Sequence, residues 1–106
     1  MLTTEEINDL VDRIVKRLDP HKVIIFGSYA KGTSTTTSDL DILVVKESEK
    51  LMASRAEELM PIFASMQIRV DVHIYTPEEI EAYGSEPLSF ISSVLRTGEV
   101  AYERFQ

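Results

Sequence analysis

Three carboxylates and a Gly-Ser pair are the residues of this chain whose types and spacing could do chemistry. Gly27 and Ser28 end the stretch KVIIFGS, Asp39 and Asp41 lead into the apolar stretch LDILVV, and Asp71 lies in IRVDVHIY. A turn that leads into a helix presents backbone N–H groups and a positive dipole end to an anion. Glycine lets the anion approach the main chain, and the serine adds a hydroxyl donor. The pair therefore predicts a phosphate-binding turn.

The spacing of the carboxylates predicts that they share one face of a sheet. Side chains two apart on a strand point the same way, so Asp39 and Asp41 lie opposite the apolar side chains of their stretch. The same alternation puts Asp71, His73 and Tyr75 on one face of the third stretch. Close carboxylates repel one another unless divalent cations neutralise them, and Mg²⁺ prefers oxygen ligands that it shares with substrate phosphates. The set predicts a two-metal phosphoryl-transfer site, with ions about 3.5–4 Å apart.

Helices alternate with these strands along the chain. Apolar residues at helical spacing predict a helix over TTEEINDLVDRIVKRL, with Thr3 and Glu6 as a capping box and Pro20 beyond its end. SYAK is short enough for one helical turn closed by Gly32. Residues 50–66 predict a helix that Pro61 kinks or splits. Its methionines are interpreted as core residues: Met52, Met60 and Met66.

The second half of the chain completes an α/β (α+β) fold. IRVDVHIY predicts a third strand, and TPEE, beginning at Thr76, predicts a helix start with proline at the first position. PLSFISSVLRTGEVAYERF predicts a short helix that stops at Gly98, followed by an edge strand. This order favours a short mixed sheet with helices packed on one face and the candidate site on the other.

Composition limits the classes of function. With 106 residues, 43% of them hydrophobic and 27% charged, the chain is expected to form one globular domain. The apolar runs are far shorter than the roughly 20 residues that cross a bilayer, which favours a cytoplasmic, unanchored protein without membrane contact. Without cysteine, a metal must be held by oxygen or imidazole ligands. A net charge of −7 argues against direct nucleic acid binding and favours a small molecule or a basic protein as partner.

The motif as a whole resembles that of a known superfamily. Gly27-Ser28, ten intervening residues and Asp39-Leu-Asp41 are similar to the GSx10DxD signature of the polymerase β-like nucleotidyltransferases, and Asp71 matches their third carboxylate. KVIIFGSYAKGTSTTTSDLDILVV and the carboxy-terminal FISSVLRTGEVAYE resemble the minimal nucleotidyltransferase (MNT) family. The resemblance implies a single domain over residues 1–106. It also implies a HEPN-domain partner, with AMP moved from ATP to a tyrosine of a HEPN toxin, an antitoxin role.

The resemblance assigns roles to residues. Asp39 and Asp41 would ligate two Mg²⁺ ions, and Asp71 would ligate the ion nearest the nucleophile and help to remove its proton. Gly27, Ser28 and Lys31 would bind the nucleotide, with Lys31 standing where an arginine is common. The loop TSTTTS departs from the family in lacking charged residues and proline. The chain also lacks the helical substrate domain of larger relatives, so a second subunit would complete the acceptor pocket. A homo-oligomer is one form this could take.

Other readings stay open. A small-molecule acceptor of the antibiotic type is one alternative, and a non-catalytic antitoxin that acts by binding alone is another. Ordinary surface positions explain Tyr29 and Lys31 about as well as contact with nucleotide does, and His73 is interpreted as a partly exposed strand residue in preference to a catalytic one. The acceptor, the base and the number of nucleotides transferred are not legible in the sequence.

Overall fold

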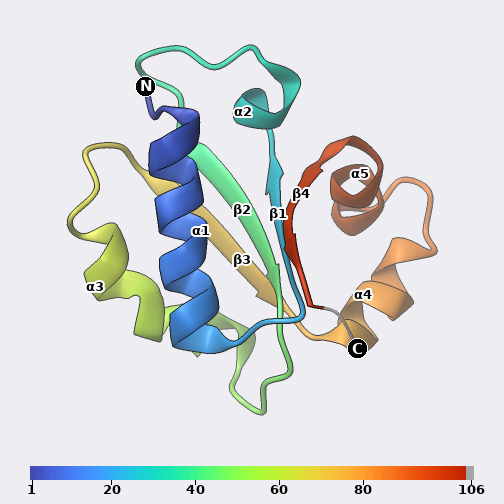
Figure 1. Ribbon diagram of the computed structural model, residues 1–106. Coiled ribbons are helices and arrows are strands. Elements are labelled where there is room, and N and C mark those ends of the chain that lie inside the picture. Colours follow the sequence, from blue (N-terminus) through green and yellow to red (C-terminus); the bar gives the residue numbers. More distant parts are fainter. Residues whose placement is uncertain (105–106) are drawn as a thin grey trace.

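The computed structural model describes residues 1–104 and is built on a four-stranded sheet of order β3-β2-β1-β4 (Figure 1). Strand β1 is antiparallel to both β2 and β4, whereas β2 and β3 run parallel. The strands are β1 (Lys22–Phe26), β2 (Leu40–Val45), β3 (Val70–Tyr75) and β4 (Glu99–Glu103). The mixed sheet and the α/β class predicted from the sequence are confirmed, and β4 is the edge strand that the carboxy-terminal segment predicted. Residue 105 of that segment lies outside the described residues.

The helices begin and end close to their predicted positions. They are α1 (Thr4–Leu18), α2 (Ser28–Lys31), α3 (Met60–Phe63), α4 (Pro77–Gly84) and α5 (Phe90–Thr97). The predicted capping box of α1 is present: the Thr3 hydroxyl accepts from the Glu6 N–H at 3.1 Å, and the Glu6 carboxylate accepts from the Thr3 N–H at 3.0 Å. Gly32 ends α2 in the left-handed conformation, as expected. Among residues 1–104, no helix combines the length and apolar character that crossing a bilayer requires.

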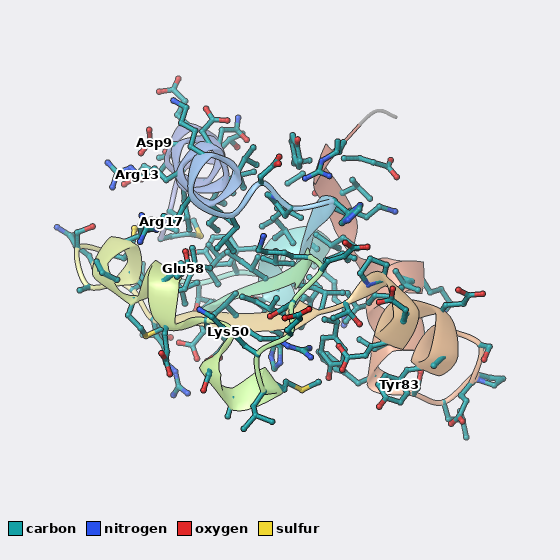
Figure 2. All side chains as sticks on the ribbon, turned by 90° about the horizontal axis from the view of Figure 1, so that it is seen from below. Asp9, Arg13, Arg17, Lys50, Glu58 and Tyr83 are labelled. Atoms are coloured by element: carbon teal, nitrogen blue, oxygen red, sulfur yellow. The ribbon has the colours of Figure 1, made fainter. Side chains whose placement is uncertain are left out.

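Helices cover both faces of the sheet, to different extents. Alternate β2 side chains, Leu40 and Ile42 among them, point into the larger core, which α1 closes. Leu43 points the other way and packs against Ile91 and Val94 of α5. The end-on view places α1 on one side of the sheet and α4 and α5 on the other (Figure 2). The expected layer over one face is confirmed, and the candidate-site face is in addition partly covered by α5.

The predicted helix over residues 50–66 is split, as Pro61 led us to expect, and most of it is not α-helix. It is replaced by two 3-10 turns, η1 (Met52–Ser54) and η2 (Glu57–Leu59), and by the short α3. The break lies before Pro61, which occupies the first turn of α3, where a missing N–H costs nothing. Met52 and Met60 are 45% and 48% exposed, so the interpretation of these two as core residues is wrong. Met66 does pack against the larger core.

A partly buried ion pair connects this irregular segment to the end of β3. Arg55, with a side chain 9% exposed, donates to both carboxylate oxygens of Glu79, at 2.6 and 3.3 Å, and to the Ile74 carbonyl at 3.2 Å. Glu79 also accepts from the Thr76 N–H at 2.8 Å, as part of the capping box of α4. The pair therefore fixes where β3 turns into α4.

Candidate active site

The strand register brings two of the predicted carboxylates together. Asp41 of β2 is the register partner of Asp71 on the parallel strand β3, and also of Phe26 on the antiparallel strand β1. Their side chains lie on the face opposite α1, because Ile42 and Leu40 occupy the α1 face of the same strand. Phe26, Asp41 and Asp71 thus form one row across three strands. The alternation of residues in each strand predicted that Asp41 and Asp71 share this face, but it did not predict Phe26 beside them.

The turn after β1 lies directly against this row. Gly27 has φ +73° and ψ −150°, a conformation that only glycine adopts readily. A Cβ atom at this position would lie 2.2 Å from Oδ2 of Asp41. Glycine is therefore favoured at position 27 for two reasons: it adopts this backbone conformation readily, and it leaves room for the Asp41 carboxylate. The main chain at residues 27 and 28 approaches Asp41 because a side chain is absent there.

The carboxylates carry an excess of negative charge. Partial burial, followed by the charges of Asp71 and Asp39, raises the pKa of the Asp41 carboxyl above its usual value, and His73 offsets part of this rise. Asp71 Oδ1 accepts a hydrogen bond from Arg69 Nε at 3.1 Å, and the Arg69 side chain is 75% exposed. An exposed pair of this kind contributes little stability. The Arg69 side chain could therefore leave Asp71 and interact with solvent or with a substrate.

These donors fit a hard divalent cation in their chemistry. Carboxylates on adjacent strands, one of them partly desolvated, would be relieved of repulsion by a cation that takes oxygen ligands. Within residues 1–104, however, no three acidic or imidazole side chains are spaced to form a ready-made metal site. Mutual repulsion and the ion pair of Asp71 with Arg69 both favour this spread. For a cation to bind all three carboxylates, the side chain of Asp39 would have to rotate toward Asp41 and Asp71.

A family comparison identifies what kind of protein this chain is. Residues 7–97 match the family described as nucleotidyltransferase domain, a span that includes the glycine turn and all three aspartates. The chain belongs to this family. It is a nucleotidyltransferase, as the motif predicted, and its resemblance to the minimal members is confirmed.

Individual relatives agree with this assignment. A Methanocaldococcus jannaschii protein named "Putative protein adenylyltransferase MJ1305" is 28% identical over 109 residues, covering 92% of this chain and 73% of the relative. A solved structure described as a "putative nucleotidyltransferase" from Sulfolobus solfataricus has a TM-score of 0.64 and 22% identity, over 92% of this chain and 78% of the other. A solved toxin–antitoxin structure with AMP-PNP has a TM-score of 0.59 and 18% identity, over 92% and 73%. The two structures establish a shared fold.

The other predicted site residues of the nucleotidyltransferase lie in the segment between β1 and β2. Ser28 is the first residue of α2, directly after Gly27, and Asp39 immediately precedes β2. Lys31 is exposed at the carboxy-terminal end of α2. Tyr29 has a structural position, because its ring packs against the larger core and its hydroxyl accepts from the Leu2 N–H at 3.0 Å.

The loop between the turn at Gly27 and β2 is ordered by its own hydroxyl groups. The Ser38 hydroxyl accepts from the Thr35 N–H at 2.8 Å, and the Ser38 N–H donates to the Thr35 carbonyl at 3.1 Å. Serine and threonine side chains favour such local turns. The stretch TSTTTS therefore replaces the charged and proline residues common in the family with a turn of its own making.

Three residues near the carboxylates escaped the sequence analysis. Arg69 lies two residues before Asp71, so the strand alternation that grouped Asp71 with His73 could have included it. Phe26 and Phe90 reach this face from β1 and α5. Only the packing of α5 on the sheet shows that Phe90 meets His73, because these residues are far apart in the sequence.

Proposed function

We propose that this nucleotidyltransferase transfers AMP from ATP to a protein hydroxyl. The acceptor is a tyrosine side chain of a HEPN toxin, and the transfer inactivates that toxin. The observation that carries the proposal is the row in which Asp41 and Asp71 are register partners and Gly27 leaves its main chain open beside Asp41. The relative named as a protein adenylyltransferase supports a protein acceptor. The toxin–antitoxin structure with AMP-PNP, an ATP analogue, supports the toxin partner and the adenine nucleotide.

The residues divide the reaction between them. Ser28 and the main-chain N–H groups around it hold the terminal phosphates, since the first turn of a helix has N–H groups without helical partners. Lys31, one turn away, adds positive charge. The acceptor oxygen forms a bond to the α-phosphorus, the bond from that phosphorus to the bridging oxygen breaks, and pyrophosphate leaves with the electron pair. Asp71 takes up the proton of the acceptor hydroxyl.

Asp39, Asp41 and Asp71 would hold two Mg²⁺ ions in this proposal. Bound there, the ions would neutralise the carboxylates and the charge that develops on the phosphate oxygens. Keeping Asp71 and Asp39 as like-charged neighbours of Asp41 is useful to a transferase and costly to a protein that acts by binding alone. The three aspartates therefore favour a catalytic antitoxin over one that acts by binding alone.

Intact-mass spectrometry tests the proposal. A candidate HEPN toxin is incubated with the purified chain, Mg²⁺ and each of the four nucleoside triphosphates in turn. We expect the toxin to gain the mass of one or more AMP groups with ATP, and to gain none when Asp39→Asn and Asp41→Asn are combined. The matched control is Asp12→Asn on the exposed face of α1, which should leave the mass gain unchanged.

The contrary outcomes are equally specific. A toxin that is silenced with no mass gain from any triphosphate would point to inhibition by binding. Transfer to a small-molecule hydroxyl with none to protein would place the chain with antibiotic-type transferases.

A further inference from the structure

Aromatic rings adjoin the carboxylate row on the same face of the sheet. The centroid of Phe90 lies 5.5 Å from that of Phe26, with the rings nearly perpendicular, and 5.1 Å from that of His73. Phe26 and His73 are 6.0 Å apart. We call Phe26, His73 and Phe90 the ring cluster. Each ring comes from a different element, β1, β3 and α5, so the cluster is a product of the fold.

The ring cluster is open to solvent and continues along the sheet. Phe90 is 43% exposed although it is large and apolar. Tyr75 lies 6.5 Å from Phe90 and 6.3 Å from Tyr83 of α4, which is itself 46% exposed and labelled in Figure 2. Exposed apolar surface that is contiguous with a polar site commonly marks a binding surface. The rings therefore extend the candidate active site on one side.

The strand directions fix which side this is. Strand β1 ends at Phe26, level with Asp41, and Gly27 and Ser28 continue beyond that level. His73 is level with Leu43, two residues further along the parallel strands in the opposite direction, roughly 7 Å from the carboxylate row. The phosphate turn, the carboxylate row with Phe26 beside Asp41, and His73 thus follow one another in that order along the sheet, and Phe90 contacts both Phe26 and His73.

The geometry of the reaction assigns an occupant to the rings. In an in-line displacement the entering oxygen and the leaving pyrophosphate lie on opposite sides of the phosphorus. If pyrophosphate leaves toward Gly27 and Ser28, the acceptor enters from the side of the ring cluster. The ribose stays bonded to the α-phosphorus through an oxygen that lies off the line between the entering and leaving oxygens, so the base does not lie on this line.

We propose that Phe26, His73 and Phe90 form the acceptor subsite and bind a planar aromatic ring, the phenol of a protein side chain, with its hydroxyl directed at the carboxylate row. This inference rests on the proposed function for the direction of attack. Ring pairs at these distances prefer edge-to-face or offset contacts, and a third ring extends the same packing. A phenol presents a flat apolar body to the ring cluster and a hydroxyl beyond it, which an aliphatic hydroxyl does not.

Binding of a small phenol tests the subsite without requiring catalysis. ¹⁵N- and methyl-labelled full-length chain is titrated with N-acetyl-tyrosinamide, and separately with N-acetyl-leucinamide, and chemical shifts are followed. We expect tyrosinamide to shift signals of Phe26, His73 and Phe90, and leucinamide to bind clearly more weakly. Phe90→Ala should weaken tyrosinamide binding about fivefold to tenfold, the factor that one aromatic pair contributes. Leu95→Ala on the same helix is the matched control, because Leu95 is 42% exposed, and it should leave binding unchanged.

A second measurement separates this inference from the proposed function. AMP-PNP binding with Mg²⁺ should be equal in the wild-type chain and Phe90→Ala, since the rings contact the acceptor. A loss of AMP-PNP affinity in Phe90→Ala would show that the rings hold the base and would overturn the subsite. Equal binding of the two amides, or shifts confined to other surfaces, would overturn it as well. Phenol binding at the rings together with no nucleotide transfer would leave the subsite standing and would count against the proposed function alone.

Discussion

Asp41 is the residue at which function and stability conflict most directly. Its carboxylate is partly desolvated and has Asp71 and Asp39 as like-charged neighbours, and these effects raise its pKa. Between the unfolded and the folded pKa the native state binds more protons than the unfolded state, so stability falls as the pH rises through that window. Above it, ionised Asp41 destabilises the fold. Such a cost is expected where a protein holds charges for a ligand.

Replacing this charge should therefore stabilise the metal-free protein. Asp41→Asn should raise the melting temperature by a few degrees at about pH 7 in buffer with chelator, and the gain should diminish as the pH falls through the raised pKa of Asp41 toward the ordinary aspartate value of about 3.9. Circular dichroism melts across this range measure the effect, with Asp12→Asn on α1 as control. A melting temperature lowered by Asp41→Asn at neutral pH would show that the carboxylate stabilises the fold.

Gly27 offers a test with an internal control. Gly27 and Gly32 share a φ of +73°, but a Cβ at Gly27 meets Asp41 Oδ2 at 2.2 Å, whereas one at Gly32 meets nothing within 4 Å. Gly32→Ala should cost about 1 kcal/mol and keep transfer activity. Gly27→Ala should cost about 1–3 kcal/mol and abolish transfer, because it displaces the carboxylate. Urea denaturation and a transfer assay measure both. Equal losses of activity in the two variants would contradict the special role of residue 27.

At the scale of elements, sequence reasoning succeeded where a local pattern and the fold agree. The helix α1 was predictable because its apolar spacing and its capping box with Thr3 indicate the same boundaries. The shared face of Asp41 and Asp71 was predictable from strand alternation. The segment 50–66 was not, because its conformation depends on Arg55 reaching the Glu79 carboxylate, a pairing between distant residues. The position of Phe90 beside His73 was hidden for the same reason.

The Arg55–Glu79 ion pair should dominate the stability of that segment. Arg55→Ala leaves Glu79 without its bidentate partner and should lower the free energy of unfolding by about 2 kcal/mol, because the pair is only partly buried. Arg13→Ala removes an exposed pair with Asp9, both side chains more than half exposed (Figure 2), and should change it by less than about 0.5 kcal/mol. Urea denaturation compares the two variants. Similarly small changes in the free energy of unfolding for the two variants would show that the Arg55–Glu79 pair does not stabilise this segment more than an exposed pair does.

The same pair predicts a response to acid. The hydrogen bond from Arg55 is the main cause that lowers the pKa of Glu79 in the folded chain. Its stabilisation is therefore complete above the unfolded pKa and is lost as the pH falls through the lowered folded value. Unfolding titrations at decreasing pH should show wild type losing more stability than Arg55→Ala. Parallel curves for the two proteins would contradict the linkage.

At the scale of the whole molecule, net charge separates the candidate partners. With 18 acidic and 11 basic residues, the chain carries a net charge of −7. Binding to a nucleic acid backbone requires clustered cations that release counterions, whereas a basic protein surface is attracted to an acidic one. A protein acceptor is thus consistent with both the carboxylate row and the overall charge.

This charge leads to a simple binding prediction. Labelled single-stranded RNA and duplex DNA should show no rise in fluorescence anisotropy up to about 10 μM chain at low salt, a concentration at which non-specific binders are expected to respond. A salt-sensitive rise would show a cationic surface that the net charge conceals, and a nucleic acid acceptor would then come into consideration.

The central claim is that the row of Asp41 and Asp71 beside Gly27 transfers a nucleoside monophosphate. The most direct measurement incubates the chain and the proposed HEPN toxin with Mg²⁺ and ATP labelled either in the α- or in the γ-phosphate. Label from the α-position should become covalently attached to the toxin, label from the γ-position should not, and the combined variant Asp39→Asn with Asp41→Asn should attach neither. Attachment of γ-label, or undiminished attachment of α-label in the double variant, would contradict the account.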